Sequence, residues 1–485
     1  MTRRKTLLAA FAAGAMLLAA CGSDDDSSTA TDAPAGTEAP AGTEAPAETD
    51  APEATEAPAE TEAPEGTEAP AETEAPAETD APAAEAWAVN TDDCVDPDAA
   101  NAPIEGTVKI GSVMPLSGGV AAAAFAPVKS GMEAYIQYAN EQGLLPGYTI
   151  ELSVEDDQYN AELTPGAVST LIDADVNLFS GIIGSANNAA VRDTLNDECI
   201  PQLNALTGSP AWGEVADYPW TTGILIPYNV ESKVYAAQIA EMHPEGAKVA
   251  LFYVNNEFGQ VYADAFKEIA DEYNLEIVDE QTIEATDSNP PTSQVTTIAG
   301  EKPDVVMAVP LGAGCISFLS ELASAKAQNA DWAPETFITN TCASALILGA
   351  AGAAADGLYT SGATVDIGDP AVQEIPVVKE YIDYMTGLGF GDIVTTAAAG
   401  WTTGEVTVAI LKQAAESPEG LTRASIINAA RNFTYTPTLA SEGVVDKSIG
   451  EEDPYLAESL QVLQYDADTA TFSDVGSLIT QFETP

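Results

Sequence analysis

Apolar segments alternate with amphipathic ones from residue 107 onward, and each apolar segment ends in a turn. Residues 107–118 (TVKIGSVMPLSG) predict a strand and a Pro/Ser/Gly turn. Residues 126–147 then predict an amphipathic helix that stops at Gly143, and residues 148–160 a second strand that ends in acidic residues. A second helix is expected over 163–174.

The same rhythm restarts after Gly223. Residues 247–259 predict a strand and a polar turn, followed by a helix at 260–272, a strand at 275–283 and a helix near 292–300. The remaining predicted elements are a strand within 303–314, a helix from Ile316, and strands within 335–344 and 354–365. Alternating strands and helices in both halves predict two doubly wound α/β lobes.

Residues 175–213, between these halves, contain two small-residue turns that each follow a short strand. The first turn is Gly184–Asn188 and the second is Ala205–Ser209. A strand that ends in Gly and Ser and opens a helix directs free backbone N–H groups at one point. Both turns leave the same edge of a parallel sheet, so we interpret the stretch as half of a binding cleft. The alternative is two ordinary strand-to-helix turns.

The charge of the chain excludes one class of partner. Its 485 residues carry 76 acidic and 16 basic side chains, a formal charge of −60. Such a chain repels nucleic acid and anionic lipid surfaces. The chain is longer than the chains that usually fold around a single hydrophobic core, which agrees with two lobes.

The first twenty residues are typical of an export signal. Arg3, Arg4 and Lys5 precede a short apolar run that is too short to remain as a membrane span. Residues 18–21 (LAAC) resemble the bacterial lipobox, which predicts that Cys21 is lipidated and anchors the protein to the outer face of the cytoplasmic membrane. The alternative is a plain secretory peptide with a chance cysteine.

A low-complexity segment follows the signal. Residues 31–84 repeat a six-residue unit nine times, beginning TDAPAG and TEAPAG. Without aromatic or branched aliphatic side chains such a segment cannot bury a core. We therefore expect residues 21–106 to be a lipidated, disordered linker, with folded structure starting near Thr107.

Four cysteines remain besides Cys21, and an even number in an exported protein indicates two disulfides. Four cysteines allow three pairings, which the sequence alone leaves open. We favour Cys94–Cys199 and Cys315–Cys342, because each pair then lies within one predicted lobe.

Enzymatic and metal chemistry have little support in the sequence. The single histidine, His243, precedes a proline at a predicted helix end, and no nucleophile elbow, Walker sequence, zinc motif or EF-hand spacing is present. Gly312 and Gly314 follow a strand as in dinucleotide sites, but the third glycine position holds Ser317. We expect a protein that is not an enzyme and has no cofactor and no metal.

Seven motifs occur in the order seen in type I periplasmic-binding proteins, and the pattern resembles the branch that binds leucine, isoleucine and valine for ABC importers. They include VEDDQYNAELTPGAVSTLI, NLFSGIIGSANNAA, VALFYVNNEFGQVYADAF and AAAGWTTGEVTVAILKQA, and the resemblance runs from Thr107 to about Leu463. It implies two lobes joined by three crossings that close on a ligand like a hinged trap.

The resemblance also places the lobes and their connections. Lobe 1 would comprise residues 107–224 and 362–440, and lobe 2 residues 225–358 and 441–485. The crossings are expected near Gly223–Tyr228, near Leu358–Thr364 and within 435–455.

In amino-acid binders of this branch, a serine after the strand–glycine turn and small residues after the next strand hold the polar end of the ligand. The family's acidic partner for the ligand ammonium would fall near Thr341, where this chain has no carboxylate. The ligand is therefore left open between a branched-chain amino acid, an amide, urea and a small carboxylate. The ligand-binding residues that the resemblance implies are Ser117, Phe125, Ser185, Ala186, Leu206, Thr207, Gly208, Phe258, Leu311, Gly312 and Thr341.

The predicted function is that of a monomeric solute receptor that delivers a small molecule to the permease subunits of an ABC importer. The alternative is a ligand sensor of the same fold that signals to a membrane partner.

Overall fold

The computed structural model describes residues 86–117, 120–284, 289–457 and 459–482. The predicted signal peptide, the lipidation site Cys21 and the repeat segment lie outside the described residues. Within the described part of the chain, no helix combines the length and the hydropathy that crossing a bilayer requires.

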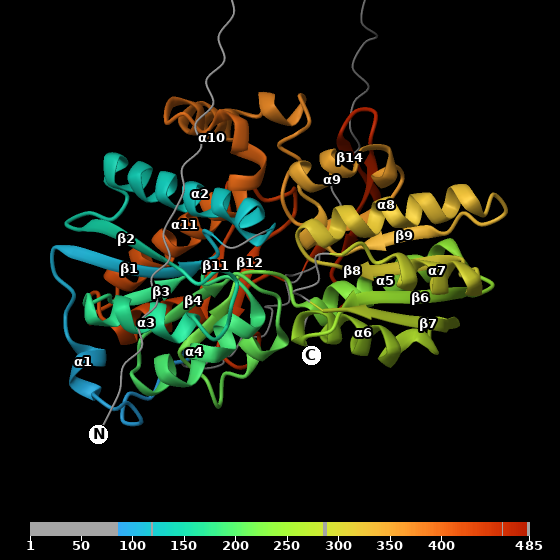
Figure 1. The fold of residues 1–485 in the computed structure, drawn as a ribbon. Coiled ribbons are helices and arrows are strands. Elements are labelled where there is room, and N and C mark those ends of the chain that lie inside the picture. The colour runs from blue at the N-terminus through green and yellow to red at the C-terminus, as the bar shows by residue number, and fades with distance from the viewer. Residues whose placement is uncertain (1–85, 118–119, 285–288, 458, 483–485) are drawn as a thin grey trace, which may run out of the picture. The chain divides into compact units, whose positions relative to one another are not determined.

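Lobe 1 is built on a five-stranded parallel sheet with the strand order β2-β1-β3-β4-β5 (Figure 1). Helices α2, α3 and α4 connect its strands in turn, as the alternating pattern predicts. The strands are β1 (Thr107–Met114), β2 (Thr149–Asp156), β3 (Leu178–Ser180), β4 (Gln202–Ala205) and β5 (Thr221–Gly223); the helices are α2 (Val120–Gln142), α3 (Thr164–Asp173) and α4 (Ser185–Asp197).

A late segment of the chain completes lobe 1. Helix α11 (Val394–Ala415) lies against α2 so closely that glycine is needed on both sides. A Cβ on Gly131 would lie 2.0 Å from the Ala397 carbonyl oxygen, and one on Gly400 would lie 1.8 Å from that of Val128. The two helices therefore pack backbone to backbone and join the early and late parts of this lobe.

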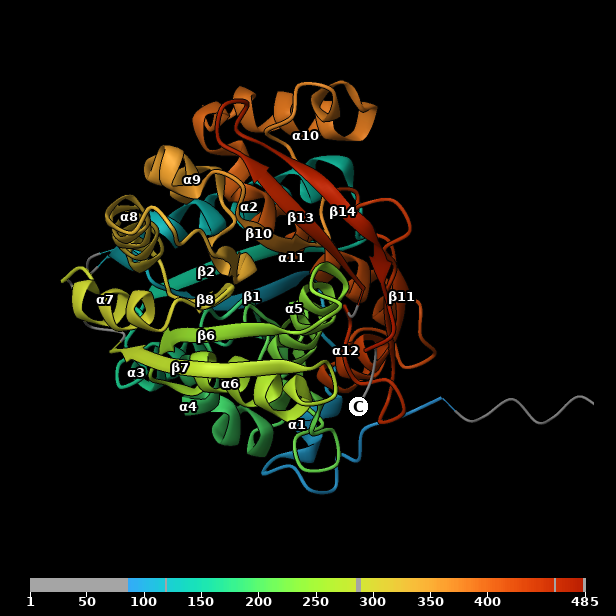
Figure 2. The same ribbon diagram turned by 90° about the vertical axis from the view of Figure 1, so that its right-hand side faces the viewer.

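Lobe 2 is built on a seven-stranded sheet with the order β14-β13-β10-β9-β8-β6-β7. Five of its strands are parallel, while β13 and β14 form an antiparallel hairpin at one edge (Figure 2). The strands are β6 (Ala247–Val254), β7 (Leu275–Ile283), β8 (Val305–Val309), β9 (Glu335–Ile338), β10 (Tyr359–Gly362), β13 (Leu460–Asp466) and β14 (Thr471–Ile479); the helices are α5 (Tyr228–Met242), α6 (Glu257–Ala270), α7 (Thr292–Glu301), α8 (Ala313–Gln328) and α9 (Ala345–Ala351).

The chain passes between the two sheets three times, as the resemblance implies. The passages follow β5, follow β10, and lie between β12 (Asp446–Ile449) and β13. Strand β12 pairs with β11 (Asn432–Tyr435) in a separate two-stranded sheet. Helices α10 (Pro376–Gly387) and α12 (Arg423–Arg431) complete this part of the chain. The fold class is confirmed; the residue limits of the lobes stay predictions, and β10 carries the second sheet to Gly362.

Folded structure begins earlier than the predicted Thr107. The backbone N–H of Trp87 donates to Asn432 Oδ1 (3.1 Å), that of Val89 donates to Asn428 Oδ1 (2.7 Å), and helix α1 (Pro97–Asn101) follows. The prediction that the disordered linker extends to residue 106 is therefore wrong, because ordered contacts begin at Trp87. Side-chain amides of α12 and β11 hold this segment, so it needs few apolar residues of its own.

Both favoured disulfides are present. Cys94 is bonded to Cys199, just beyond the end of α4, with 5.5 Å between the Cα atoms. Cys315 in α8 is bonded to Cys342, just after β9, with 5.9 Å between the Cα atoms. The first ties the early segment to lobe 1, and the second braces two adjacent turns of lobe 2.

Candidate functional site

The two small-residue turns of lobe 1 lie side by side at the carboxyl ends of β3 and β4. Ile183 and Leu206 form a parallel bridge just beyond these strands. The next residues bring two hydroxyl groups together: Ser185 Oγ lies 2.6 Å from Thr207 Oγ1, and both side chains are buried. The predicted pairing of the two turns is therefore present, with Ser185 as the first residue of α4.

Glycine shapes both of these turns. Gly184 has a φ of 98°, and a Cβ there would lie 2.6 Å from Asn187 Oδ1. Gly208 has no room for a Cβ, which would lie 2.2 Å from the Ile226 carbonyl oxygen and 2.6 Å from the Tyr228 ring. The absence of a side chain at Gly208 thus allows the first helix of lobe 2, which begins at Tyr228, to approach the second turn.

Aromatic rings of both lobes lie next to these turns, with Tyr159 beside Gly184 and Tyr228 beside Gly208. Tyr228 stacks on Tyr262 with 4.9 Å between the ring centroids and meets Phe258 edge to face at 5.0 Å. Phe125 stacks on Tyr159 at 5.9 Å in lobe 1. Burial raises the pKa of Tyr228 to about 12, and that of Tyr159 rises for the same reason, with Tyr228 as the next cause. Both phenols are therefore neutral hydrogen-bonding groups at physiological pH.

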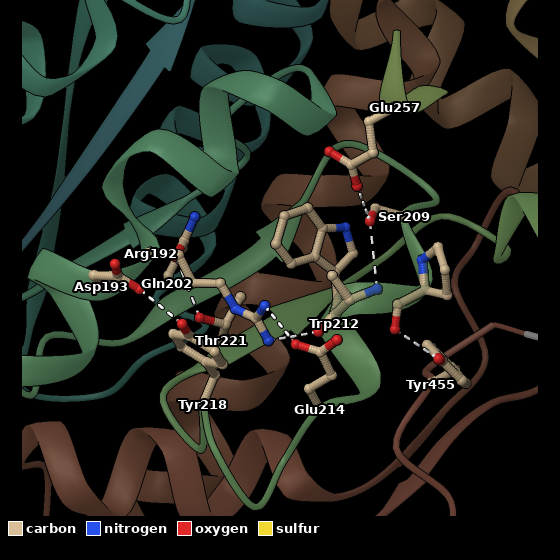
Figure 3. Close-up of polar contacts among 12 residues, drawn as sticks. Arg192, Asp193, Gln202, Ser209, Trp212, Glu214, Tyr218, Thr221, Glu257 and Tyr455 are labelled. Carbon is tan, nitrogen blue, oxygen red and sulfur yellow. Dashed lines mark hydrogen bonds and ion pairs between the residues drawn. The ribbon is translucent and has the colours of Figure 1, made fainter. Parts of the chain in front are cut away.

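A direct hydrogen bond links the second turn to lobe 2. Ser209 Oγ donates to Glu257 Oε1 across 2.5 Å, and Figure 3 shows the two side chains facing each other. Glu257 is the first residue of α6, at the carboxyl end of β6. The Asn256 side chain caps that helix by accepting from the Gly259 N–H at 3.2 Å. The start of α6 is thus fixed where it meets the turn of lobe 1.

The outer side of the second turn is held by a polar cluster (Figure 3). Arg192 Nη1 lies 2.9 Å from Glu214 Oε2, and its guanidinium carbon lies 3.5 Å from the centroid of the Tyr218 ring. The Trp212 indole N–H donates to the Thr207 carbonyl (3.0 Å), and the Tyr455 hydroxyl donates to that of Pro210 (2.7 Å). These contacts fix the backbone that carries Thr207.

The predicted residues of lobe 2 lie at the carboxyl ends of three parallel strands. Phe258 follows β6, Leu311 and Gly312 follow β8, and Thr341 follows β9. Gly312 has a φ of 55° and precedes α8. Phe258 is buried against Tyr228, whereas Leu311 and Thr341 are half-buried. Each is therefore at the sheet edge where doubly wound folds bind ligands.

Some of the predicted ligand-binding residues form no hydrogen bond with the others in the described part of the chain. Ser117 is exposed, and its hydroxyl and backbone N–H both donate to Asp156 at the end of β2. Ala186 is exposed on α4, and Leu206 is half-buried. The roles of these three residues in binding stay predictions.

A buried carboxylate that the sequence did not reveal is hydrogen-bonded to Asn340, the residue before Thr341. Glu231, in the first turn of α5, is fully buried and accepts from the Asn340 N–H (2.8 Å), from Ser361 Oγ (3.0 Å) and from the hydroxyl groups of Tyr235 and Tyr262. Burial raises its pKa, although these hydrogen bonds act in the opposite direction. A glutamate in a helical first turn is typical of ordinary capping, so nothing in the pattern separated it from the other acids.

The sequence also did not indicate Tyr159, Tyr228 and Tyr262 as candidate site residues. The sequence signal that could have found Tyr228 is its place directly after the first crossing. Within the described ranges, no group of three His, Cys, Asp or Glu side chains is placed to hold a metal ion. Hydroxyl groups, backbone N–H groups and aromatic faces are what this arrangement offers a ligand.

Known proteins share both the sequence pattern and this architecture. A family model described as periplasmic binding protein matches residues 107–470. A branched-chain amino acid ABC transporter structure from Thermus thermophilus with bound valine is similar at 18% identity and a TM-score of 0.69, covering 78% of this chain and 97% of that one. No curated protein matches the sequence significantly.

Two further solved structures are similar at TM-scores of 0.65 and 0.63. The first is a fatty acid ABC transporter substrate-binding protein from Thermomonospora curvata, at 18% identity over 79% of this chain and 97% of that one. The second is a solute-binding protein of an ABC transporter from R. palustris in complex with 4-hydroxybenzoate, at 17% identity over 77% and 97%. At these identities the likeness shows a common fold.

Proposed function

This chain belongs to the periplasmic binding protein family, and we propose that it captures a small polar molecule between its two lobes and delivers it to the permease of an ABC importer. The family is one of binding proteins, not enzymes.

The observation that carries the ligand proposal is the buried hydroxyl pair Ser185–Thr207 at the carboxyl ends of β3 and β4. One hydroxyl donates to the other, so the pair has one further proton to donate, to a ligand oxygen or to the neighbouring Tyr228 hydroxyl. The backbone N–H groups of the first turn of α4 point out of the N-terminal end of that helix, where Ser185 lies. A ligand carboxylate or amide oxygen is the matching partner for such donors.

The rest of the surroundings supports a ligand with an apolar or aromatic body. Tyr159 lies next to Gly184 and Tyr228 next to Gly208, and Phe125 and Phe258 pack against these two tyrosines. The similar structures include one with bound valine, one of a fatty acid ABC transporter and one in complex with 4-hydroxybenzoate, and these compounds all combine a carboxylate with an apolar portion. We therefore place small carboxylates first, with amides and urea after them.

Export and anchoring form the second part of the proposal. The two disulfides agree with an oxidising compartment. Lipidation of Cys21 would hold the receptor at the membrane beside its permease, with the repeat segment as a tether. Replacing Cys21 with Ser should release the protein or stall its processing. Unchanged membrane retention and lipid labelling of that variant would contradict the anchor.

A thermal-shift screen tests the ligand proposal. Small carboxylates, branched-chain amino acids, amides and urea are added to the purified chain, and the unfolding midpoint is followed. A true ligand at about 100 times its Kd adds roughly 2.7 kcal/mol to the free energy of unfolding. A saturable shift with a small carboxylate supports the proposal, and no shift with any compound up to millimolar concentration contradicts it.

A further inference from the structure

A polar cavity of about 200 Å³ lies in lobe 2 at the amino-terminal ends of β9 and β10. The charged and hydroxyl-bearing side chains in its lining are Lys326 in the last turn of α8, Glu335 and Thr336 at the start of β9, Asp356, and Tyr359 at the start of β10. The predicted ligand-binding residues of lobe 2 follow the carboxyl ends of the strands instead. This cavity therefore lies at the opposite edge of the same sheet.

Three hydrogen-bond donors in this lining lack a partner among the residues that the structure describes. Thr336 is only 6% exposed, and its hydroxyl forms no hydrogen bond with any of them. The Tyr359 hydroxyl forms none either; burial, followed by the nearby Glu335 carboxylate, raises its pKa, so the phenol keeps its proton at physiological pH. The Lys326 ammonium has no ion-pair partner in the described ranges. Because an unpaired buried hydroxyl is costly, Thr336 indicates an occupant that forms a hydrogen bond with it.

Two carboxylates that each keep one oxygen free line the same cavity. Asp356 Oδ1 accepts from the Ala467 N–H at 3.1 Å, and Glu335 Oε2 lies 2.6 Å from His243 Nε2. The second oxygen of each carboxylate has no hydrogen-bond partner in the described part of the chain. Neither carboxylate forms an ion pair with Lys326, so positive and negative groups line one space without neutralising each other.

We propose that this cavity is a second binding site of the chain and takes a small zwitterion of the amino-acid type. The ligand carboxylate accepts hydrogen bonds from Lys326, Thr336 and Tyr359. The ligand ammonium donates to the free oxygens of Asp356 and Glu335. A ligand with one charge alone leaves either the donors or the carboxylates unpaired, which is the basis of the selectivity.

The size of the cavity limits this ligand. A cavity of about 150 Å³ holds benzene, so roughly 200 Å³ suits a zwitterion of about six to eight heavy atoms. The site stands independently of the proposed function, because its lining contains none of the predicted ligand-binding residues.

Four probes separate a zwitterion from a single charge. L-alanine and β-alanine carry both charged groups, whereas propionate carries only the carboxylate and propylamine only the ammonium. The two zwitterions also differ in the separation of their charges. Calorimetry on the whole chain should show that at least one zwitterion binds about tenfold more tightly than propionate and propylamine, the usual cost of leaving a polar group unpaired.

Three variants assign each contact. Lys326→Met removes the ammonium and should cancel the preference of the zwitterion over propylamine. Asp356→Asn removes a negative charge and should cancel the preference over propionate. Thr336→Val keeps the shape of the side chain but removes the hydroxyl, and should weaken zwitterion binding about fivefold. Lys326 is half-buried and Asp356 is exposed, so the first two changes leave the core of lobe 2 intact.

Matched controls are available in lobe 1. Lys412 lies in the last turn of α11, as Lys326 lies in the last turn of α8. Lys412→Met should therefore keep the parent affinity for the zwitterion, whereas a general effect of losing a positive charge would change both methionine variants alike. Ser185→Ala should also keep that affinity, because Ser185 belongs to the proposed site between the lobes.

The outcomes distinguish this site from the proposed function. Absence of zwitterion binding up to millimolar concentration, or equal affinity for all four probes, shows that the cavity takes only water and overturns the site. Binding that is weakened in Ser185→Ala but unchanged in Lys326→Met assigns the zwitterion to the proposed site between the lobes and overturns the second one. Binding that is weakened in Lys326→Met and Asp356→Asn, but not in Lys412→Met or Ser185→Ala, supports the second site even if the proposed function fails.

Discussion

Ser209 and Glu257 belong to different lobes, yet the serine hydroxyl lies 2.5 Å from the glutamate carboxylate. Ser209 follows the turn that carries Thr207, and Glu257 opens α6 directly before Phe258. The hydrogen bond therefore joins the predicted ligand-binding positions of the two lobes. Because a hinged receptor binds its ligand by bringing the lobes together, a bond that forms between them favours the ligand-bound arrangement.

We expect Ser209→Ala to weaken ligand binding by roughly 2- to 12-fold, since a net hydrogen bond contributes about 0.5–1.5 kcal/mol. Glu257→Gln should have an effect of similar size. The double variant should lose little more than either single one, because both changes remove the same bond. Calorimetry on the three variants measures this coupling. Additive losses would show that the two residues act separately.

The stability of the protein should fall as pH rises through neutrality, in part because of Asp446. This residue of β12 is buried; burial, followed by the nearby Glu405 carboxylate, raises its pKa to about 7. An unfolded aspartate has a pKa of about 3.9. The folded protein therefore binds the extra proton between these values, and the resulting stabilisation is lost as pH rises through the folded pKa.

Asp446→Asn removes the charge but keeps the shape. It should raise the free energy of unfolding at pH 8 by an amount on the order of 1–4 kcal/mol, and change it much less at pH 5, where the parent side chain is already protonated. Urea unfolding at the two pH values provides the comparison. Equal changes at both pH values would refute the protonation argument. Glu405 and Tyr435 face the same place, so their substitution is not a neutral control.

The two disulfides should differ in their contribution to stability. Cys94–Cys199 spans 105 residues and Cys315–Cys342 spans 27. In the chain-entropy description, the longer loop restricts the unfolded state more, by about 1 kcal/mol. Replacing both cysteines of the first pair with Ala should therefore destabilise the chain more than the same change in the second pair. Denaturant unfolding of the two double variants measures the difference, and the reverse order would contradict it.

Strand positions and fold class followed from the sequence because they depend on local periodicity. The strand predicted at 275–283 coincides with β7, and the helix predicted near 292–300 corresponds to α7 at Thr292–Glu301. Periodicity survives in a single sequence because each buried face must repeat at 2 or 3.6 residues. The disulfide pairing could also be predicted, once each pair of cysteines was assumed to lie within one lobe.

Features that depend on contacts between residues distant in the sequence could not be predicted from the sequence. Trp87 and Val89 are held by side-chain amides more than 330 residues away, and no local pattern reports such partners. Glu231 comes within hydrogen-bond distance of the Asn340 N–H only through tertiary packing, and no local pattern indicates that contact. The Tyr228–Tyr262 stack is likewise a product of packing.

The hydroxyl pair Ser185–Thr207 at the carboxyl ends of β3 and β4 is the central element of the proposed binding site. Calorimetry on Ser185→Ala tests its role in ligand binding most directly. With the compound that the thermal-shift screen returns, the variant should bind about 5- to 150-fold more weakly, the cost of 1–3 kcal/mol for an unpaired buried polar group. Ser180→Ala is the matched control, because Ser180 forms a similar buried hydroxyl pair with Thr407 at 2.8 Å within the lobe. We expect the control to keep the parent Kd; parent-like binding by Ser185→Ala would contradict the placement of the site.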